Sequence, residues 1–225
     1  MDKPVIFLGP SLRLEKARKI FPDAEYRPPA KKGDFLRLAT NPEVRIVGFI
    51  DGVFLQDYPP TPIEVYQLAI KEGMILAGAA SLGALRAVEL EKFGMVGIGK
   101  IFQLYKIGKL NADDEVAVTF VPEGDYQLQS EALIDIRYNL FLAHRKGIIS
   151  RQAKKALARV AKEIYFPYRT YSNLVEEAKV KYQILADEID SFHSYIVSNR
   201  KSLKELDAMR LVAYIKECSI KYNAA

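Results

Sequence analysis

Residues 74–90 read Met-Ile-Leu-Ala-Gly-Ala-Ala-Ser-Leu-Gly-Ala-Leu-Arg-Ala-Val-Glu-Leu, and this stretch decides the fold. The apolar run 74–77 is typical of a short buried strand, and the apolar residues that follow Gly83 recur with a helical period. Small residues fill the turn between the two segments. The stretch therefore predicts a strand, a sharp turn and a helix, with Ser81 at the turn.

The turn is similar to a relaxed form of the small-x-Ser-x-Gly elbow, with Ala79 in place of the first glycine. Such an elbow brings a strand and a helix close together and lifts the serine hydroxyl above the sheet, beside the helix N-terminus. Ser81 is therefore a candidate nucleophile. The alternative is that Ser81 only caps the helix, since serine is a favoured N-cap residue.

Strands and helices alternate along the first part of the chain, and this alternation predicts an α/β fold with an open, mostly parallel sheet flanked by helices. Strands are expected at 5–8, 24–26, 44–50 and 74–77, and helices at 12–21, 35–40, 62–73 and directly after Ser81. From Ser130 onward the pattern changes to helices. We therefore expect an α/β core domain at residues 1–125 and a basic, helical, partner-docking region at residues 126–225.

The segment between these parts carries two ambiguous motifs. Residues 93–99 contain three glycines, but their spacing fits neither a dinucleotide fingerprint nor a Walker loop, so we expect a tight connection or a surface loop. The acidic residues 113–115 are expected to form a solvated turn, although such a run also suits a metal ion. A helix is expected over 100–107 and a strand over 116–121.

The composition places the chain among globular proteins. It has 225 residues, of which 49% are hydrophobic, and this is enough for a true core. No apolar run reaches the length of about 18 residues that a membrane span needs, and the N-terminus lacks a signal-peptide pattern, so we expect a cytoplasmic protein. Cys218 is the only cysteine, which excludes a disulfide framework and a cysteine metal cluster. We expect no metal and no cofactor.

The charge is unevenly distributed along the chain. Residues 139–225 carry a net charge of +7, whereas residues 1–138 carry a net charge of −2. A basic part suits an acidic partner protein or nucleic acid. We expect protein docking, because the basic helix 151–164 and the long break after it fit a helix-turn-helix poorly and no aromatic-basic interleaving is present. We therefore do not expect this part of the chain to bind nucleic acid.

The expected site lies at one edge of the sheet, because ligands of open parallel sheets bind at the carboxyl ends of the strands. Candidate substrate-binding residues at these ends are Gly9 and Ser11 after the first strand and Asp51 and Gly52 after the third, beside the elbow at 78–83. We expect these three loops to lie side by side around one pocket. For Asp51 and Gly52 an ordinary turn is the alternative.

Histidine is absent from the first 143 residues, and this limits the chemistry available to Ser81. His144 lies on an apolar helix face and is expected to be a packed core residue. A buried lysine with a lowered pKa can activate a serine instead. Lys31 is the best candidate, because the stiff Pro28-Pro29 segment would hold it in place; the alternative is a solvated loop charge. The other lysines near the expected pocket in sequence are Lys32, Lys100 and Lys106.

Several segments together resemble the TfuA-like family. The strongest match is residues 78–89, Gly-Ala-Ala-Ser-Leu-Gly-Ala-Leu-Arg-Ala-Val-Glu. The resemblance runs over about residues 5–121, and its other segments are 6–11, 26–34, 50–54, 93–99 and 113–117. The helical remainder shows no match of this kind.

The resemblance implies a role in forming thioamides in peptide backbones. TfuA-like proteins act with a YcaO enzyme, which uses ATP to activate the peptide amide oxygen. The TfuA-like partner is implied to supply sulfide by hydrolysing the thiocarboxylate at the C-terminus of a small ThiS-like, ubiquitin-fold sulfur carrier. Residues 59–65 look similar to methanogen members, which are implied to thioamidate a glycine of methyl-coenzyme M reductase.

Two positions depart from the family pattern. Leu82 stands where the family often has methionine, which is a mild change. Residues 60–63 stand where many members carry a histidine-containing segment, so no chemistry assigned to that histidine applies to this chain.

These observations combine into the hypothesis of a Ser-Lys hydrolase. Lys31, neutral in a partly buried site, takes the proton of Ser81, which attacks the thiocarboxylate carbon. The backbone N–H groups of Leu82 and of residues 9–11 hold the oxyanion, and Arg86 either steers the thiocarboxylate or forms a structural ion pair. The alternative function is a non-catalytic scaffold that recruits the substrate or the sulfur carrier to YcaO.

Overall fold

The computed structural model describes residues 3–53, 57–121 and 126–224, and the chain divides into two compact units. The first unit consists of Met1–Asn111 and Lys204–Ala225, and the second of Ala112–Leu203. The sequence placed a single boundary at residue 125. The structure instead returns the C-terminal helix to the first unit, because its apolar face covers the sheet there.

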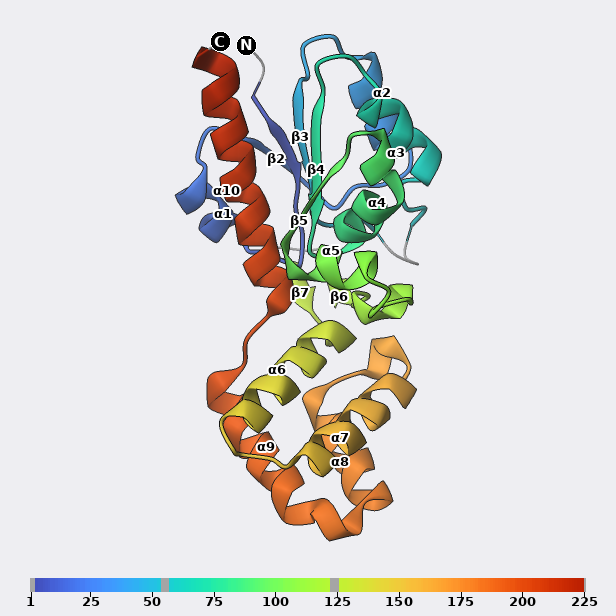
Figure 1. Ribbon diagram of the computed structural model, residues 1–225, viewed down its shortest axis with the longest axis vertical. Coiled ribbons are helices and arrows are strands. Elements are labelled where there is room, and N and C mark those ends of the chain that lie inside the picture. Colours follow the sequence, from blue (N-terminus) through green and yellow to red (C-terminus); the bar gives the residue numbers. More distant parts are fainter. Residues whose placement is uncertain (1–2, 54–56, 122–125, 225) are drawn as a thin grey trace. The chain divides into compact units, whose positions relative to one another are not determined.

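The first unit is built on a parallel sheet with the strand order β2-β1-β3-β4-β5 (Figure 1). Its strands are β1 (Val5–Phe7), β2 (Glu25–Arg27), β3 (Ile46–Phe49), β4 (Ile75–Ala79) and β5 (Val96–Ile98). Every neighbouring pair in this order runs parallel. The α/β fold with an open parallel sheet is therefore confirmed.

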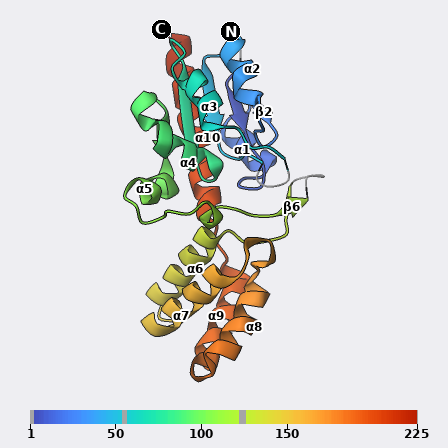
Figure 2. The same ribbon diagram turned by 90° about the vertical axis from the view of Figure 1, so that its right-hand side faces the viewer.

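Helices cover both faces of this sheet (Figures 1 and 2). One face is covered by α1 (Leu14–Ile20) and by the long α10 (Leu203–Ala224). The other face is covered by α2 (Asp34–Thr40), α3 (Pro62–Ala69), α4 (Leu82–Leu90) and α5 (Gly99–Lys106). The central strands β1 and β3 are buried at every position, which explains why they read as continuous apolar runs rather than alternating ones.

The contact between α10 and the sheet depends on a glycine in the middle of β3. A Cβ added to Gly48 would lie 2.8 Å from Leu211 Cδ2, a side chain of α10. Together with Ala208, Val212 and Ile215, Leu211 belongs to the buried cluster that lies between α10, α1 and the sheet. The helical pattern of residues 203–224 was expected, but its place on the sheet was not.

Two segments differ from their sequence-based expectations. The glycine-rich stretch 93–99 is not a surface loop, because residues 96–98 form the edge strand β5; Gly97 leaves room for the ring of Phe102, 2.2 Å from where a Cβ would lie. The strand expected over 116–121 shrinks to β6 (Phe120–Val121), which pairs with β7 (Gln127–Leu128) in an antiparallel hairpin. Apolar runs of this length do not distinguish a strand from buried irregular chain.

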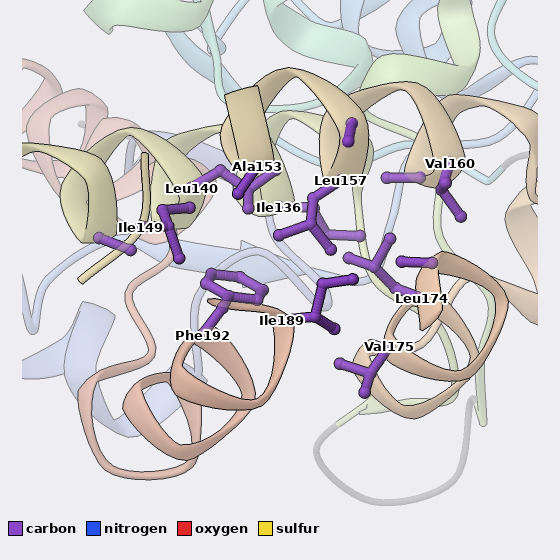
Figure 3. Close-up of a cluster of buried hydrophobic side chains, with 14 of the residues drawn as sticks. Ile136, Leu140, Ile149, Ala153, Leu157, Val160, Leu174, Val175, Ile189 and Phe192 are labelled. Atoms are coloured by element: carbon purple, nitrogen blue, oxygen red, sulfur yellow. The ribbon is translucent and has the colours of Figure 1, made fainter. Parts of the chain in front are cut away.

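The second unit has its own hydrophobic core. Its helices are α6 (Leu133–Arg145), α7 (Arg151–Glu163), α8 (Tyr171–Lys181) and α9 (Ala186–Asn199). The described residues of this unit also form short 3₁₀ turns at Asp113–Glu115, Phe166–Tyr168 and Gln183–Leu185, and those of the first unit form one at Glu91–Phe93. Figure 3 shows the core, in which Leu157 and Val160 of α7 face Leu174 of α8 and Ile189 and Phe192 of α9. In the described residues, no helix has the length and apolar character that crossing a bilayer requires.

Candidate functional site

The loops after β1 and β3 are tied together by one buried carboxylate. Asp51, which is 1% exposed, accepts hydrogen bonds from the N–H groups of Gly9 and Ser11 through Oδ2, both at 3.0 Å. The Ser11 hydroxyl donates to Asp51 Oδ1 at 2.6 Å. Asp51 is therefore an anchor between two strand ends and not the ordinary exposed turn residue that was its alternative.

A chain of close contacts extends from these loops to Ser81. A Cβ on Gly9 would lie 2.4 Å from Pro29 Cγ, and Ala30 forms a parallel bridge with Gly52. A Cβ on Gly52 would in turn lie 2.5 Å from Leu82 Cδ2. These contacts bring the three loops side by side at the carboxyl edge of the sheet, as expected, while the pocket expected between them stays a prediction.

The elbow itself is a strained turn. Ala80 has a positive φ of 65°, and the N–H of Ser81 donates to the carbonyl of Ala79 at 2.8 Å, so Ala80 is the central residue of a γ-turn. A residue with a Cβ in this region costs roughly 1–2 kcal/mol, and such strain gathers at functional sites. The fold retains this strained conformation despite its energetic cost. We infer that the turn is needed to orient Ser81.

Two glycines allow the strand and the helix of the elbow to approach each other. A Cβ on Gly83 would lie 1.8 Å from the Phe49 carbonyl oxygen, and one on Gly78 would lie 2.1 Å from the Gly83 carbonyl oxygen. The N–H of Gly83 donates to the Ile50 carbonyl at 3.2 Å. The predicted close approach of strand and helix is thus present, and backbone atoms enforce it.

Ser81 occupies the N-cap position of α4, but its side chain makes no capping hydrogen bond. The residue is 9% exposed. The interpretation of Ser81 as a conventional side-chain cap therefore does not hold, and its hydroxyl is left for another role.

Two backbone N–H groups beside Ser81 lack an acceptor within the described part of the chain: those of Leu82, at the start of α4, and of Gly52. On one side of the segment that follows β3, the Ala30 N–H donates to the Asp51 carbonyl and the Val53 N–H donates to the Ala30 carbonyl. The N–H of Gly52 therefore faces the opposite side of this segment, where β4 and the elbow lie. An oxyanion site needs such donors.

The other expected oxyanion donors must be corrected. The N–H groups of Gly9 and Ser11 are both occupied by Asp51, and Pro10 between them has no N–H. The physical reason is that a buried carboxylate must satisfy its oxygens, and these two N–H groups are within its reach.

Lys31 lies on the loop that joins β2 to α2, at the same edge of the sheet. Its backbone N–H donates to Asp34 Oδ2 at 2.7 Å. The backbone N–H of Gly33, in the same loop, donates to Glu64 Oε2 at 2.6 Å. The loop is therefore held at two points. The residue is exposed, whereas the hypothesis required partial burial, and among the described residues no hydrogen bond joins it to Ser81.

A family model described as TfuA-like protein matches residues 51–170, more than half of the chain. The chain belongs to the TfuA-like family. This family is associated with YcaO-dependent thioamidation. A search of curated proteins gives no significant match. The matched segment of the TfuA-like model starts at Asp51, contains the elbow and ends at Thr170, so it reaches the helices α6 and α7, further than the resemblance over residues 5–121.

Arg86, one turn into α4 of this TfuA-like chain, is held by structural contacts. Its Nη1 donates to both carboxylate oxygens of Glu89, at 3.0 and 2.9 Å, and its Nη2 donates to the Pro60 carbonyl at 3.4 Å. The side chain is 14% exposed, and its Nε is buried without an acceptor in the described residues. The geometry thus favours the structural ion pair over a steering role.

Two of the acidic residues 113–115 form a structural cluster instead of a solvated turn, whereas Asp113 is exposed. Asp114 pairs with Lys162 and with Arg169, which is 1% exposed, and Glu115 pairs with Arg137. Burial raises the pKa of Asp114, but the hydrogen bonds and charges of its two cationic partners hold it below the ordinary value. In the described ranges no group of three acidic, histidine or cysteine side chains forms a metal site.

Glu64 is a site residue that the sequence reasoning missed. It is 2% exposed, and besides holding Gly33 it accepts from the N–H of Thr61, whose hydroxyl accepts from Glu64 N–H in a capping box. The pattern Thr-Pro-Ile-Glu at 61–64 is a capping-box signature, and from it the role of Glu64 at the start of α3 could have been predicted. His144 Nδ1 lies 3.0 Å from the Ile149 carbonyl oxygen, and the residue is half-buried instead of packed in the core as expected.

Proposed function

We propose that this TfuA-like protein supplies sulfide for peptide-backbone thioamide formation by a YcaO enzyme, and that Ser81 cleaves the thiocarboxylate of a ThiS-like sulfur carrier. The observation that carries the proposal is the strained γ-turn at Ala80, which leaves the Ser81 hydroxyl without a capping bond at the N-terminus of α4. A serine that does not cap its helix, at the carboxyl edge of a parallel sheet, suits nucleophilic attack.

In the proposed reaction, Ser81 Oγ attacks the thiocarboxylate carbon and the carbon–sulfur bond breaks. The serine proton passes by way of the Lys31 amine to the leaving sulfur, which departs as hydrosulfide. Water then hydrolyses the ester, restores the serine and releases the carrier with an ordinary carboxylate. The N–H groups of Leu82 and Gly52 support the oxyanion, and each such donor is worth about 10²–10³ in rate.

Lys31 acts in this proposal only when the carrier is bound. The residue is exposed in the free chain, and a carrier tail lying between the 28–33 loop and the elbow would cover it. Desolvation lowers the pKa of a lysine, which would provide the neutral amine that a general base requires. The hydrogen bonds of Gly33 to Glu64 and of Lys31 to Asp34 support this role, because they fix the loop before binding.

The proposed final acceptor is a glycine of methyl-coenzyme M reductase, modified by YcaO with the released sulfide. The support is the resemblance of residues 59–65 to methanogen members of the family. This stretch contains the capping box of α3, and Pro60 is held by Arg86 against α4, next to the elbow.

The test is sulfide release from a thiocarboxylated ThiS-like carrier, measured for the native protein and for Ser81→Ala, Lys31→Ala and Lys32→Ala. Ser81→Ala is expected to lower the rate at least about a thousandfold, as loss of a nucleophile does. Lys31→Ala is expected to cause a comparable loss. Lys32→Ala is the matched control, because Lys32 is the exposed neighbour that lies over the Tyr58 ring, and its variant should keep the native rate.

A second candidate function is a scaffold that brings the carrier or the substrate to YcaO without chemistry of its own. The exposure of Lys31 and the occupied N–H groups of Gly9 and Ser11 favour it. No sulfide release from the native protein, together with tighter binding of substrate by YcaO in its presence, would establish the scaffold and reject the hydrolase.

A further inference from the structure

The second unit carries a cavity that the proposed reaction does not use. It has a volume of about 180 Å³ and lies between α7 and the turn that links α8 to α9. Its lining residues are Gln152, Lys155, Ala156, Arg159, Tyr182 and Leu185. We call this place the α7 groove. Its size suits one side chain of a partner and not a whole cofactor.

The rim of the α7 groove is an uncompensated cationic stripe. Arg151, Lys155 and Arg159 follow one another at intervals of four residues, so they lie on the same side of α7, about 6 Å apart at Cβ. None of the three forms an ion pair within the described residues, although Lys162 at the end of the same helix does. Like charges at this spacing destabilise a helix, and the one described carboxylate bonded to the N-terminus of α7, that of Glu188, is held by Ser150 and not by these cations.

The floor of the groove is apolar. Ala156 and Leu185 are buried, at 8% and 7% exposure, and the Tyr182 ring is half-buried beside them. The residue before Leu185, Ile184, is 90% exposed, and Val180 is 77% exposed, so the same end of the unit presents apolar side chains to solvent. Val180 lies in a separate hollow with Glu176 and Glu177, so of these two only Ile184, next to Leu185 in sequence, adjoins the lining of the groove. An apolar floor rimmed by cations is typical of a protein-docking surface.

We propose that the α7 groove docks an acidic segment of a protein partner, which places one apolar side chain in the cavity and carboxylates on Lys155 and Arg159. Charge complementarity selects this occupant, because the rim offers only cations and the Gln152 amide, while the floor offers only carbon surface and the Tyr182 hydroxyl. The inference does not depend on the reaction proposed for Ser81, because all of its residues belong to the second unit.

A nucleic acid fits these features less well. The second unit, residues 112–203, contains as many acidic as basic residues, so it has no net positive field to hold a phosphate backbone. Stacking of bases needs exposed aromatic side chains along the track, and the groove contributes only Tyr182.

The experiment measures the fluorescence anisotropy of a labelled peptide made of aspartate and glutamate around one leucine, titrated with the full-length protein. The double variant Lys155→Gln, Arg159→Gln is compared with Lys109→Gln, Lys216→Gln, which loses the same charge on the first unit. The groove variant is expected to weaken binding about tenfold, as the loss of two partly exposed charge pairs does, and the control variant less than twofold. Replacing the leucine of the peptide by serine should weaken binding further.

Three results would overturn the inference. The first is an equal loss of affinity in the groove and control variants, which would show general charge attraction. The second is absence of peptide binding at physiological salt. The third is preference for a labelled oligo-dT strand over the peptide, which would make the surface a nucleic-acid site. Circular dichroism of each variant shows that α7 remains folded.

Discussion

At the scale of single residues, the elbow is determined by backbone clearance. Gly83 lies inside α4, where alanine is preferred over glycine by about 1 kcal/mol. The Phe49 carbonyl oxygen, 1.8 Å from where a Cβ would lie, reverses this preference, because it belongs to the backbone of a central strand and cannot give way.

The variant Gly83→Ala is therefore expected to lose on the order of 3 kcal/mol or more in the free energy of unfolding, measured with a chemical denaturant. Gly108→Ala is the matched control: Gly108 has a φ of 67° and nothing within 4 Å of its added Cβ. It should lose only about 1 kcal/mol through backbone strain. An unfolding midpoint of Gly83→Ala equal to that of the native protein would contradict the close approach.

At the scale of elements, buried carboxylates join segments that are far apart in the sequence. Asp207 of α10 accepts from the N–H of Ile101 at 2.7 Å and so caps α5, which has no capping side chain of its own. In the second unit, Glu131 before α6 pairs with Arg200 after α9 at 2.8 Å. The Asp207 contact replaces the local side-chain cap that α5 lacks, and the ion pair joins the segments before α6 and after α9.

The pair formed by Glu131 predicts an unusual pH dependence. Burial raises the pKa of Glu131 to about 7, with the charge of Asp135 adding to it and that of Arg200 opposing it. The folded chain then binds a proton that the unfolded chain releases above its ordinary pKa of 4.5. The stabilising contribution of the protonated carboxyl is complete below about pH 4.5 and is lost as the pH rises through about 7.

We expect the second unit to lose at most about 3 kcal/mol of stability through this group between pH 5 and pH 8. The variant Glu131→Gln should lack this loss, and should be more stable than the native protein at pH 8 but similar at pH 5. Denaturant unfolding at the two pH values checks this. A native protein and a variant with parallel pH profiles would show that Glu131 titrates normally.

At the scale of the whole molecule, the first unit is discontinuous in the chain. Residues 1–111 form the sheet and most of its helices, and residues 204–225 return to cover one face. The side chains of α10 in this core are Ala208, Leu211, Val212 and Ile215, all fully buried. Each of the larger three contributes about 1.5–3 kcal/mol by burial, which together approaches the whole stability of a typical domain.

A chain that ends at residue 203 is therefore expected to leave the first unit unfolded, while residues 112–203 alone keep their helices. Circular dichroism and thermal unfolding of both fragments provide the measurement. Adding the peptide 204–225 back to the longer fragment should restore part of its structure. Cooperative unfolding of the fragment 1–203 with native helix content would show that α10 is dispensable.

The sequence by itself determined the local elements and the position of the nucleophile candidate. Most of its strands and helices and the turn at Ser81 were predicted, because hydrophobic period, proline, glycine and small residues act over a few neighbouring positions. The edge strand β5 and the hairpin of β6 and β7 were not predicted. The loops at Gly9, Asp51 and Ser81 were also expected together, since parallel strands place their carboxyl ends at one edge.

Only the tertiary structure decided what these residues touch. Asp51 takes the N–H groups that were expected to hold an oxyanion, Lys31 is exposed instead of partly buried, and Arg86 is engaged by Glu89. The packing of α10 on the sheet was likewise decided by tertiary structure, because Asp207 of α10 accepts a hydrogen bond from Ile101, 106 positions earlier in the chain. The physical reason is that a polar group satisfies itself with whatever partner the packed chain brings near, and periodicity along the sequence carries no information on that partner.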